Sequence, residues 1–204
     1  MDEWTTGEAV LRKNYAEIGF AACPNVVSSG VANDVRELFL SADYDHIQQV
    51  RKRHYSHVQK MDDPLLPKEG EVYRASFSRS NSLERQELIK RLTETELMPL
   101  VARISGKVST DYELRAYRMD AGDLLRLHVD DYVAEVGFIY YLSTEWRWDW
   151  GGILSVVRGD TVSSIAPTFN QLVVINHGLR LPHFVSQITD YALQPRYMLV
   201  GLCR

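Results

Sequence analysis

The feature that most constrains the fold of this chain is a run of short β-type segments that begins near residue 111 and continues to the C-terminus. These segments are rich in Val, Ile, Leu and aromatic residues, and glycine or proline turns separate them. Many short strands that follow a helical half are typical of a double-sheet jelly roll. We expect strands at residues 112–119, 124–130, 135–142, 152–157, 161–166, 171–176, 183–187 and 195–203.

In the first 110 residues, by contrast, the apolar residues recur mainly at the spacing of an α-helix. The chain therefore predicts an α+β fold, with a double-stranded β-helix (jelly-roll) core and N-terminal helices packed on one sheet. We expect a single domain over 1–204, divided into a helix-rich part at 1–110 and a jelly-roll catalytic core at 111–204. The predicted N-terminal elements are helices at 8–18, 29–39, 43–61 and 84–97 and strands at 20–27 and 72–77.

Composition and charge exclude several classes of protein. The net charge of -4 over 204 residues gives no positive field for nucleic acid or for an anionic membrane. No apolar run approaches the roughly 20 residues of a membrane span. Cys23 and Cys203 lie at opposite ends of the chain, outside any Cys-x-x-Cys pattern. We therefore expect a cytoplasmic protein without nucleic-acid or membrane partners, and the sequence leaves its oligomeric state open.

The stretch from residue 126 to 132 carries the first candidate for chemistry. His128 and Asp130 are two residues apart at the end of a predicted strand, so their side chains point to the same face. An imidazole and a carboxylate so placed are two legs of the 2-His-1-carboxylate triad that suits non-haem Fe(II). The pair taken alone is weak evidence, because many such pairs lie on protein surfaces.

Two later histidines are candidates for the third ligand. His183 follows Pro182 at the start of a predicted strand, where its imidazole can point inward. His177 lies in a predicted turn, where we expect a solvent-facing or capping role. We therefore favour His183, although a hydrogen-bonded core histidine is the alternative interpretation of that residue taken alone.

Arg196 is the one charged residue of an otherwise apolar predicted strand. A guanidinium buried in such a strand needs an anionic partner, and its planar fork suits a carboxylate. The partner is either the carboxylate of a bound oxo-diacid or an internal Asp or Glu.

Together, these residues resemble the iron- and 2-oxoglutarate-dependent oxygenases, and most closely the prolyl-hydroxylase branch of that superfamily. The order His128-x-Asp130, His183, Arg196 is similar to that of the family. Further segments over about 112–202 resemble its motifs, whereas 1–110 match only in general form. These segments are the paired-tyrosine strand and Trp turn (138–146), the Trp-Gly-Gly strand (150–154), the Pro-x-x-Asn strand (166–174) and the Pro-His-x-Val strand (181–185).

The resemblance implies Fe(II) bound by the triad, with 2-oxoglutarate and O2 as cosubstrates and ascorbate as a supporting reductant. It implies that Arg196 and Tyr141 hold the distal carboxylate of 2-oxoglutarate and that Tyr117 lies near its other end. Both tyrosines have an alternative interpretation as core aromatics. In related halogenases a small residue replaces the carboxylate ligand, so Asp130 implies hydroxylation with release of succinate and CO2.

The sequence says less about the substrate. Arg126, Arg74 and Arg79 are near the expected cavity and are candidates to hold the carboxylate of a small acid, with surface charge as the alternative. Trp150 belongs to a Trp-rich rim and is a candidate substrate contact or a packing residue.

Three functions therefore remain open at this stage. The first is hydroxylation of an unactivated C–H bond in a small molecule, such as an amino acid or a natural-product intermediate. The second is a prolyl-type hydroxylase that acts on a partner polypeptide. The third is a non-catalytic binding protein on the same fold, which the complete triad and Arg196 argue against.

Overall fold

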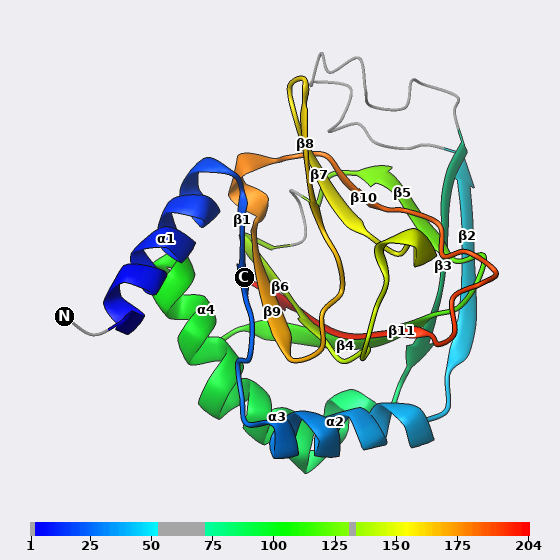
Figure 1. Cartoon of the computed structure of the whole chain (residues 1–204), viewed down its shortest axis with the longest axis horizontal. Helices are drawn as coiled ribbons and strands as arrows, with labels where there is room; N and C mark the ends of the chain where they lie inside the picture. Colours follow the sequence, from blue (N-terminus) through cyan, green and yellow to red (C-terminus); the bar gives the residue numbers. More distant parts are fainter. Residues whose placement is uncertain (1–2, 53–71, 131–133) are drawn as a thin grey trace.

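A computed structural model describes the backbone of residues 3–52, 72–130 and 134–204, and the side chains of 7–48, 75–130 and 134–204. Eleven strands in these ranges join into one antiparallel sheet that curls on itself (Figure 1). The strand order is β1-β9-β6-β11-β4-β3-β5-β10-β7-β8, and β2 pairs with β3 off this path. The strands are β1 (Phe20–Cys23), β2 (Asp45–Lys52), β3 (Val72–Ser80), β4 (Tyr112–Met119), β5 (Leu124–His128), β6 (Val136–Tyr141), β7 (Leu154–Arg158), β8 (Thr161–Ile165), β9 (Gln171–Asn176), β10 (His183–Val185) and β11 (Arg196–Cys203).

The sheet folds over at β3, which pairs with β4 through Ser78–Ser80 and with β5 through Ala75 and Ser76. One side of the fold, here called the larger sheet, contains β1, β9, β6, β11, β4, β3 and β2. The other side, the smaller sheet, contains β5, β10, β7 and β8. A cluster of buried apolar side chains that includes Met119, Tyr141 and Leu154 fills part of the space between the two sheets. This arrangement is the predicted jelly roll, and each strand expected after residue 111 is present within a few residues of its predicted bounds.

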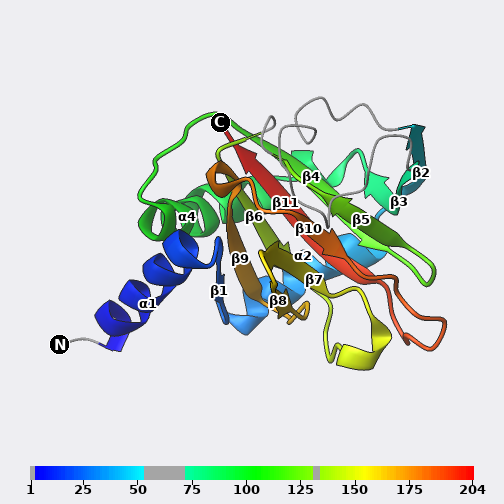
Figure 2. The same ribbon diagram turned by 90° about the horizontal axis from the view of Figure 1, so that it is seen from above.

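The four α-helices of the described ranges cover the outer face of the larger sheet, as Figures 1 and 2 show from two directions. A second buried cluster joins Val35, Phe39 and Ile89 of the helices to Tyr140 and Leu199 of the sheet. The side chain of Ser28 accepts a hydrogen bond from the backbone N–H of Val31 and caps the second helix. The packing of N-terminal helices on one sheet is therefore confirmed. The helices are α1 (Glu3–Glu17), α2 (Ser29–Ser41), α3 (Glu87–Leu92) and α4 (Met98–Ser105).

The predicted helix at 43–61 is wrong in its described part. Residues Asp45–Lys52 form β2, which pairs along its whole length with β3, from Asp45 opposite Arg79 to Lys52 opposite Val72. The sequence of β2 is polar because it is an edge strand. Pairing with β3 therefore outweighs the weak helical spacing. Residues 53–61 of that prediction lie outside the described part of the chain.

The helix predicted at 84–97 continues to Ser105 through a π-helical turn at Thr93–Leu97. The backbone N–H of Met98 bonds to the carbonyl of Thr93, five residues earlier. This wider turn directly precedes Pro99, whose ring would clash with a carbonyl four residues earlier in a regular α-helix. No helix of the described ranges is long and apolar enough to cross a bilayer.

Candidate active site

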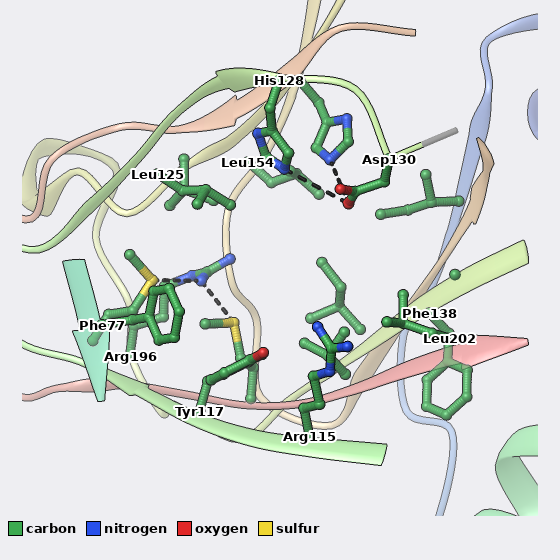
Figure 3. A pocket seen from close by; sticks show the side chains of 18 of the residues that line it. Phe77, Arg115, Tyr117, Leu125, His128, Asp130, Phe138, Leu154, Arg196 and Leu202 are labelled. Atoms are coloured by element: carbon green, nitrogen blue, oxygen red, sulfur yellow. Dashed lines mark hydrogen bonds and ion pairs between the residues drawn. The ribbon is translucent and has the colours of Figure 1, made fainter. Parts of the chain in front are cut away.

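A cavity of about 390 Å³ lies between the two sheets (Figure 3). His128, Asp130 and His183 line it from the smaller sheet, and Tyr117 and Arg196 line it from the larger sheet. Strands β2 and β3 contribute Ile47 and Phe77, so the N-terminal part of the chain also forms the wall. A volume of this size is typical of a site for a small ligand.

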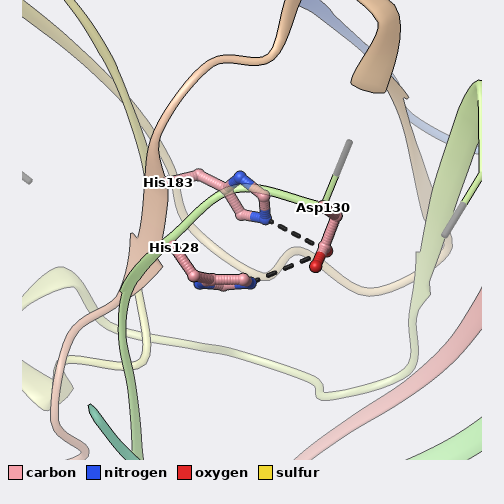
Figure 4. A group of neighbouring side chains, drawn as sticks. All are labelled: His128, Asp130 and His183. Atoms are coloured by element: carbon pink, nitrogen blue, oxygen red, sulfur yellow. Dashed lines mark ion pairs between the residues drawn. The ribbon is translucent and has the colours of Figure 1, made fainter. Parts of the chain in front are cut away.

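The ends of two paired strands bring the triad together. His128 is the last residue of β5, His183 is the first of β10, and the two lie opposite each other in the pairing of these strands. Their ring centroids are 4.2 Å apart. Asp130 follows β5, and its Oδ2 lies 3.6 Å from Nε2 of His128 and 3.5 Å from Nε2 of His183 (Figure 4).

Backbone carbonyls fix the orientation of both imidazoles. The Nδ1 of His128 lies 2.8 Å from the carbonyl oxygen of Arg126, and the Nδ1 of His183 lies 3.1 Å from that of Leu181. When each Nδ1–H donates to its carbonyl, the unprotonated Nε2 atoms face Asp130. Three acceptor atoms then converge, all within 4.8 Å of one another. A shared divalent cation satisfies such a set, and a small octahedral ion with bonds of about 2.1 Å requires donors roughly 3 Å apart.

The charge of Asp130 fits the same interpretation. Burial tends to raise the pKa of its carboxyl group, but in the metal-free protein the charge of a protonated His128 and hydrogen bonds from Nε2–H of both histidines outweigh burial. A bound cation would take the place of these protons. The pKa of Asp130 is therefore held below its ordinary value, and the group remains a carboxylate. Two neutral imidazoles and one carboxylate are the donor set of the facial triad.

Arg196 lies on the larger sheet, facing the cavity, and is fully buried. Its Nη2 donates a hydrogen bond of 2.9 Å to the hydroxyl of Tyr141, and its Nη1 contacts the sulfur atoms of Met119 and Met198. Its Nε has no hydrogen-bond partner. No carboxylate of the described residues forms an ion pair with it, so the internal salt bridge considered from the sequence is not present there. A buried guanidinium in this state is prepared for an anionic ligand.

The Trp-Gly-Gly segment supports the stem of Arg196. A Cβ atom on Gly152 would lie 3.2 Å from Cδ of Arg196, and a Cβ atom on Gly151 would lie 1.9 Å from the carbonyl oxygen of Gln187. Both glycines have positive φ angles. Trp150 is buried and packs edge to face on Trp146, with ring centroids 5.4 Å apart. It is not among the residues that line the cavity.

The paired tyrosines of β6 face opposite sides of the larger sheet. Tyr141 points to Arg196, whereas the hydroxyl of Tyr140 donates a hydrogen bond of 3.0 Å to Oδ1 of Asn170 on the helical side. Asn170 also bonds to both backbone polar groups of Val27. The Pro-x-x-Asn motif therefore joins the start of β9 to the segment that follows β1.

The other predicted site residues are distributed as follows. Tyr117 and Arg79 line the cavity, and the ring of Tyr117 packs edge to face on Phe77 at a centroid distance of 5.0 Å. Arg126 is exposed and is not among the lining residues. Arg74 belongs to β3, and its side chain lies outside the described residues.

Two polar lining residues were not assigned to the site from the sequence, because His177 was weighed against His183 as a ligand and not chosen, and Arg115 was not considered. His177, expected to face solvent or to cap a turn, is instead buried, with Nδ1 3.3 Å from the carbonyl oxygen of Asp130. Burial lowers the pKa of His177. Arg115 points into the cavity from the larger sheet (Figure 3). The alternation of Arg115 with Tyr117 along β4 was a usable signal for it.

Comparisons with known proteins agree with this geometry. Residues 113–204 match the family model described as the 2OG-Fe(II) oxygenase superfamily. No curated protein matches the chain significantly. Among solved structures, a prolyl-4-hydroxylase of Pseudomonas putida is 17% identical, with a TM-score of 0.65 and coverage of 97% of this chain and 98% of that chain.

Two further structures have the same fold. A prolyl hydroxylase from Trichoplax adhaerens, in complex with a peptide of the hypoxia inducible factor oxygen degradation domain, is 19% identical, covering 100% of this chain and 93% of that chain (TM-score 0.68). The non-heme alpha ketoglutarate dependent epimerase SnoN of nogalamycin biosynthesis is 11% identical, covering 97% and 82% (TM-score 0.65). Family membership implies Fe(II), 2-oxoglutarate and O2, and the His-Asp-His triad fits iron. Residues 113–204, which contain the triad and Arg196, therefore belong to the 2OG-Fe(II) oxygenase superfamily, and the chain is an oxidoreductase.

Proposed function

We propose that this protein hydroxylates an unactivated C–H bond of a small molecule, such as an amino acid or a natural-product intermediate, with release of succinate and CO2. The observation that carries the proposal is the position of the complete triad opposite Arg196 in one cavity of small-ligand size. Arg196 is fully buried and has no carboxylate partner in the described residues.

His128, Asp130 and His183 would hold the iron, and Arg196 and Tyr141 would hold the distal carboxylate of 2-oxoglutarate. When bound, the iron supplies the activation of dioxygen, coupled to the decarboxylation of 2-oxoglutarate. The protein orients both imidazoles through backbone carbonyls and keeps Asp130 ionised. Tyr117 lines the space between the anchor and the triad and would contact the cosubstrate nearer the metal.

The first experiment tests the metal and the cosubstrate without a known substrate. Purified protein would be titrated with Fe(II) under argon, and slow succinate formation from 2-oxoglutarate would then be measured in air. Asp130→Ala should lower metal affinity by more than about 100-fold and abolish succinate formation, because a ligand contributes at least as much as its supporting groups. Asp149→Ala removes an exposed carboxylate and serves as the matched control. Full iron-dependent turnover in Asp130→Ala would reject the ligand assignment.

A prolyl-type protein hydroxylase remains the second candidate. The likeness of the fold to two prolyl hydroxylases, one of them bound to a peptide, favours it. Incubation with matched panels of free amino acids, small acids and proline-containing peptides, followed by mass spectrometry, separates the candidates. The mass of one added oxygen atom in peptides alone would favour the protein hydroxylase.

We also propose that the protein works in the cytoplasm. Cys23 and Cys203 are buried and free, a state that a reducing compartment preserves. Fluorescence imaging of the tagged protein in its own cells tests this placement.

A further inference from the structure

We propose that Arg115 binds the carboxylate of the substrate, so that the substrate is a small organic acid with an apolar segment next to its acid group. This inference rests on the proposed function, because it assigns Arg196 to 2-oxoglutarate and leaves Arg115 for a second anion.

Arginine is prominent in the lining of the cavity, although the chain as a whole carries a net charge of -4. The described lining contains three guanidinium groups, those of Arg79, Arg115 and Arg196, and one carboxylate, that of Asp130. Asp130 belongs to the triad, so it does not neutralise the arginines in the loaded site. Arg79 and Arg115 each have one glutamate partner outside the lining, Glu84 at 3.3 Å and Glu113 at 2.8 Å. With one anionic cosubstrate at Arg196, these two guanidinium groups still face the other end of the cavity, where a planar guanidinium suits a second carboxylate.

Strand pairing places the two cations at different levels of the same sheet. Arg196 lies opposite Met119, whereas Val200 lies opposite Arg115, four residues away along each strand. At about 3.3 Å per residue, these levels are roughly 13 Å apart along the strands. Tyr117 and Tyr141 occupy the level between them. A small molecule bound at Arg196 therefore does not occupy the part of the cavity next to Arg115.

The triad faces the level of Arg115 from the smaller sheet. In Figure 3, Arg115 rises from the floor of the cavity below Asp130, and Arg196 lies to the left. The imidazole of His177 contacts the carbonyl oxygen of Asp130 and lies next to Gly137 of β6. Gly137 is two residues before Ile139, which lies opposite Val200. A carboxylate on Arg115 would thus place the neighbouring carbon atoms of its molecule between the sheet and the metal ligands.

Apolar side chains surround Arg115 on the same sheet. Val200 lies beside it on β11, and Ile139 lies beside Val200 on β6. Leu202 also lines this end of the cavity. An apolar surface next to one guanidinium fits a molecule with an acid group and a hydrocarbon portion better than a fully polar molecule.

The ion pairs of Arg115 leave part of its guanidinium for a ligand. Glu113 accepts from Nε at 2.8 Å and from Nη2 at 3.1 Å, and the guanidinium also hydrogen-bonds with Tyr117. No carboxylate of the described residues bonds to Nη1. Glu113 itself is shared with Arg204, at 3.4 Å, and does not line the cavity. The hydrogen bond from Arg115 to Glu113 is the largest of several influences that raise the pKa of Arg115, so the group stays charged.

The test measures binding of n-alkanoates, from butanoate to octanoate, and of their methyl esters by calorimetry. The full chain would be saturated with Mn(II) and 2-oxoglutarate under argon, so that the ligands do not compete for Arg196. We expect the acids to bind more tightly than the esters, and Arg115→Gln to weaken acid binding by about 10- to 100-fold without a change for the esters. Arg147→Gln, which removes an exposed arginine outside the cavity, should match the wild type.

Equal binding of acids and esters by the wild type would overturn the proposal, as would unchanged acid binding in Arg115→Gln. If Arg115→Gln does not fold, Arg115→Lys provides the test, because it keeps the charge but loses the planar fork. Acid binding in Arg115→Lys should be several-fold weaker than in the wild type, and equal affinity would reject the role of the fork. Succinate formation without substrate, measured in the wild type and in Asp130→Ala, reports the proposed function separately: its absence in the wild type would reject the proposed function, whereas the comparison of acids with esters tests Arg115.

Discussion

Gly137 of β6 and His177 lie so close that a Cβ atom on the glycine would be 2.3 Å from Nε2 of the imidazole. His177 in turn lies 3.3 Å, through Nδ1, from the carbonyl oxygen of Asp130. The absence of a side chain at residue 137 therefore lets a buried imidazole support the carboxylate arm of the triad.

Gly137→Ala should displace His177 and loosen Asp130. We expect Mn(II) affinity to fall by about 10-fold, which is typical when a group that supports a metal ligand is lost. Gly7→Ala is the control, because a Cβ atom there meets nothing within 4 Å. Metal titration of both variants checks the prediction, and wild-type affinity in Gly137→Ala would show that His177 does not support the site.

Removal of the Tyr141 hydroxyl should weaken binding of 2-oxoglutarate. Tyr141→Phe leaves the Nη2 of Arg196 without its partner at 2.9 Å and removes one group from the anchor. We expect the KM for 2-oxoglutarate to rise by roughly 10-fold with a smaller change in kcat, because a hydrogen bond to a charged group contributes about 1.5 to 3 kcal/mol. Tyr191→Phe changes an exposed tyrosine and is the matched control. A lower kcat with an unchanged KM would contradict the anchoring role.

Arg196→Gln should have a larger effect on the same constant. The substitution removes the fully buried charge that has no carboxylate partner among the described residues. We expect the KM for 2-oxoglutarate to rise by more than about 100-fold. Since the charge is unpaired in the free protein, its removal should also leave thermal stability equal or higher. Measurement of KM and of the unfolding midpoint checks both outcomes, and a strongly lowered midpoint would indicate a structural role.

Asn170→Ala should destabilise the fold without changing the cavity. The side chain of Asn170 holds the hydroxyl of Tyr140 and both backbone polar groups of Val27. Loss of three hydrogen bonds around a buried amide should cost roughly 2 to 4 kcal/mol in the free energy of unfolding. Urea denaturation checks this value, with the exposed Asn81→Ala as control. Because Asn170 lies on the helical side of the sheet, the KM for 2-oxoglutarate should remain unchanged.

The buried thiol of Cys203 should make the stability of the folded protein depend on pH in the alkaline range. Burial raises the pKa of its thiol from 9.0 to about 11. The folded state therefore binds the proton more tightly than the unfolded state, and stability falls as pH rises from about 9 to 11. The loss should approach about 2 to 3 kcal/mol. Denaturant titrations should show a shallower decline for Cys203→Ala, and identical slopes for both proteins would contradict the shift.

The sequence was most informative where local pattern and chemistry coincide. His128 and Asp130 could be placed on one face from their spacing, and the apolar surroundings of Arg196 predicted its burial. The sequence was least informative where long-range pairing decides the structure. β2 was missed because its stability depends on β3, and its own residues resemble an exposed helix. His177 was misjudged because a turn sequence carries no information about the glycine on a distant strand that makes room for its ring.

Arg115 shows a third limit of sequence reasoning. Charged residues in β4 alternate with apolar ones, and only the pairing of β4 with β11 shows which of them share a level with Val200. Arg126 was considered because it shares a strand face with His128, and Arg74 and Arg79 because they flank a strand expected to cover the mouth of the cavity. Of these three, Arg79 lines the cavity, whereas the exposed Arg126 does not. Proximity in space follows the order of strands in the sheet, which the linear sequence does not give.

The opposite orientations of Tyr140 and Tyr141 have a consequence for how this protein reaches its native state. The two residues are joined by one peptide bond, yet Tyr140 bonds to Asn170 on the helical side and Tyr141 bonds to Arg196 on the side of the cavity. A slip of β6 by one position would exchange them, and would place every neighbouring side chain of the strand on the wrong side as well. An incorrectly assembled chain would thus lose Asn170 as a partner at the same moment as it loses the cavity. The same register of β6 is therefore required for packing of the helical layer and for formation of the binding cavity, so a molecule with the native packing also has the native cavity.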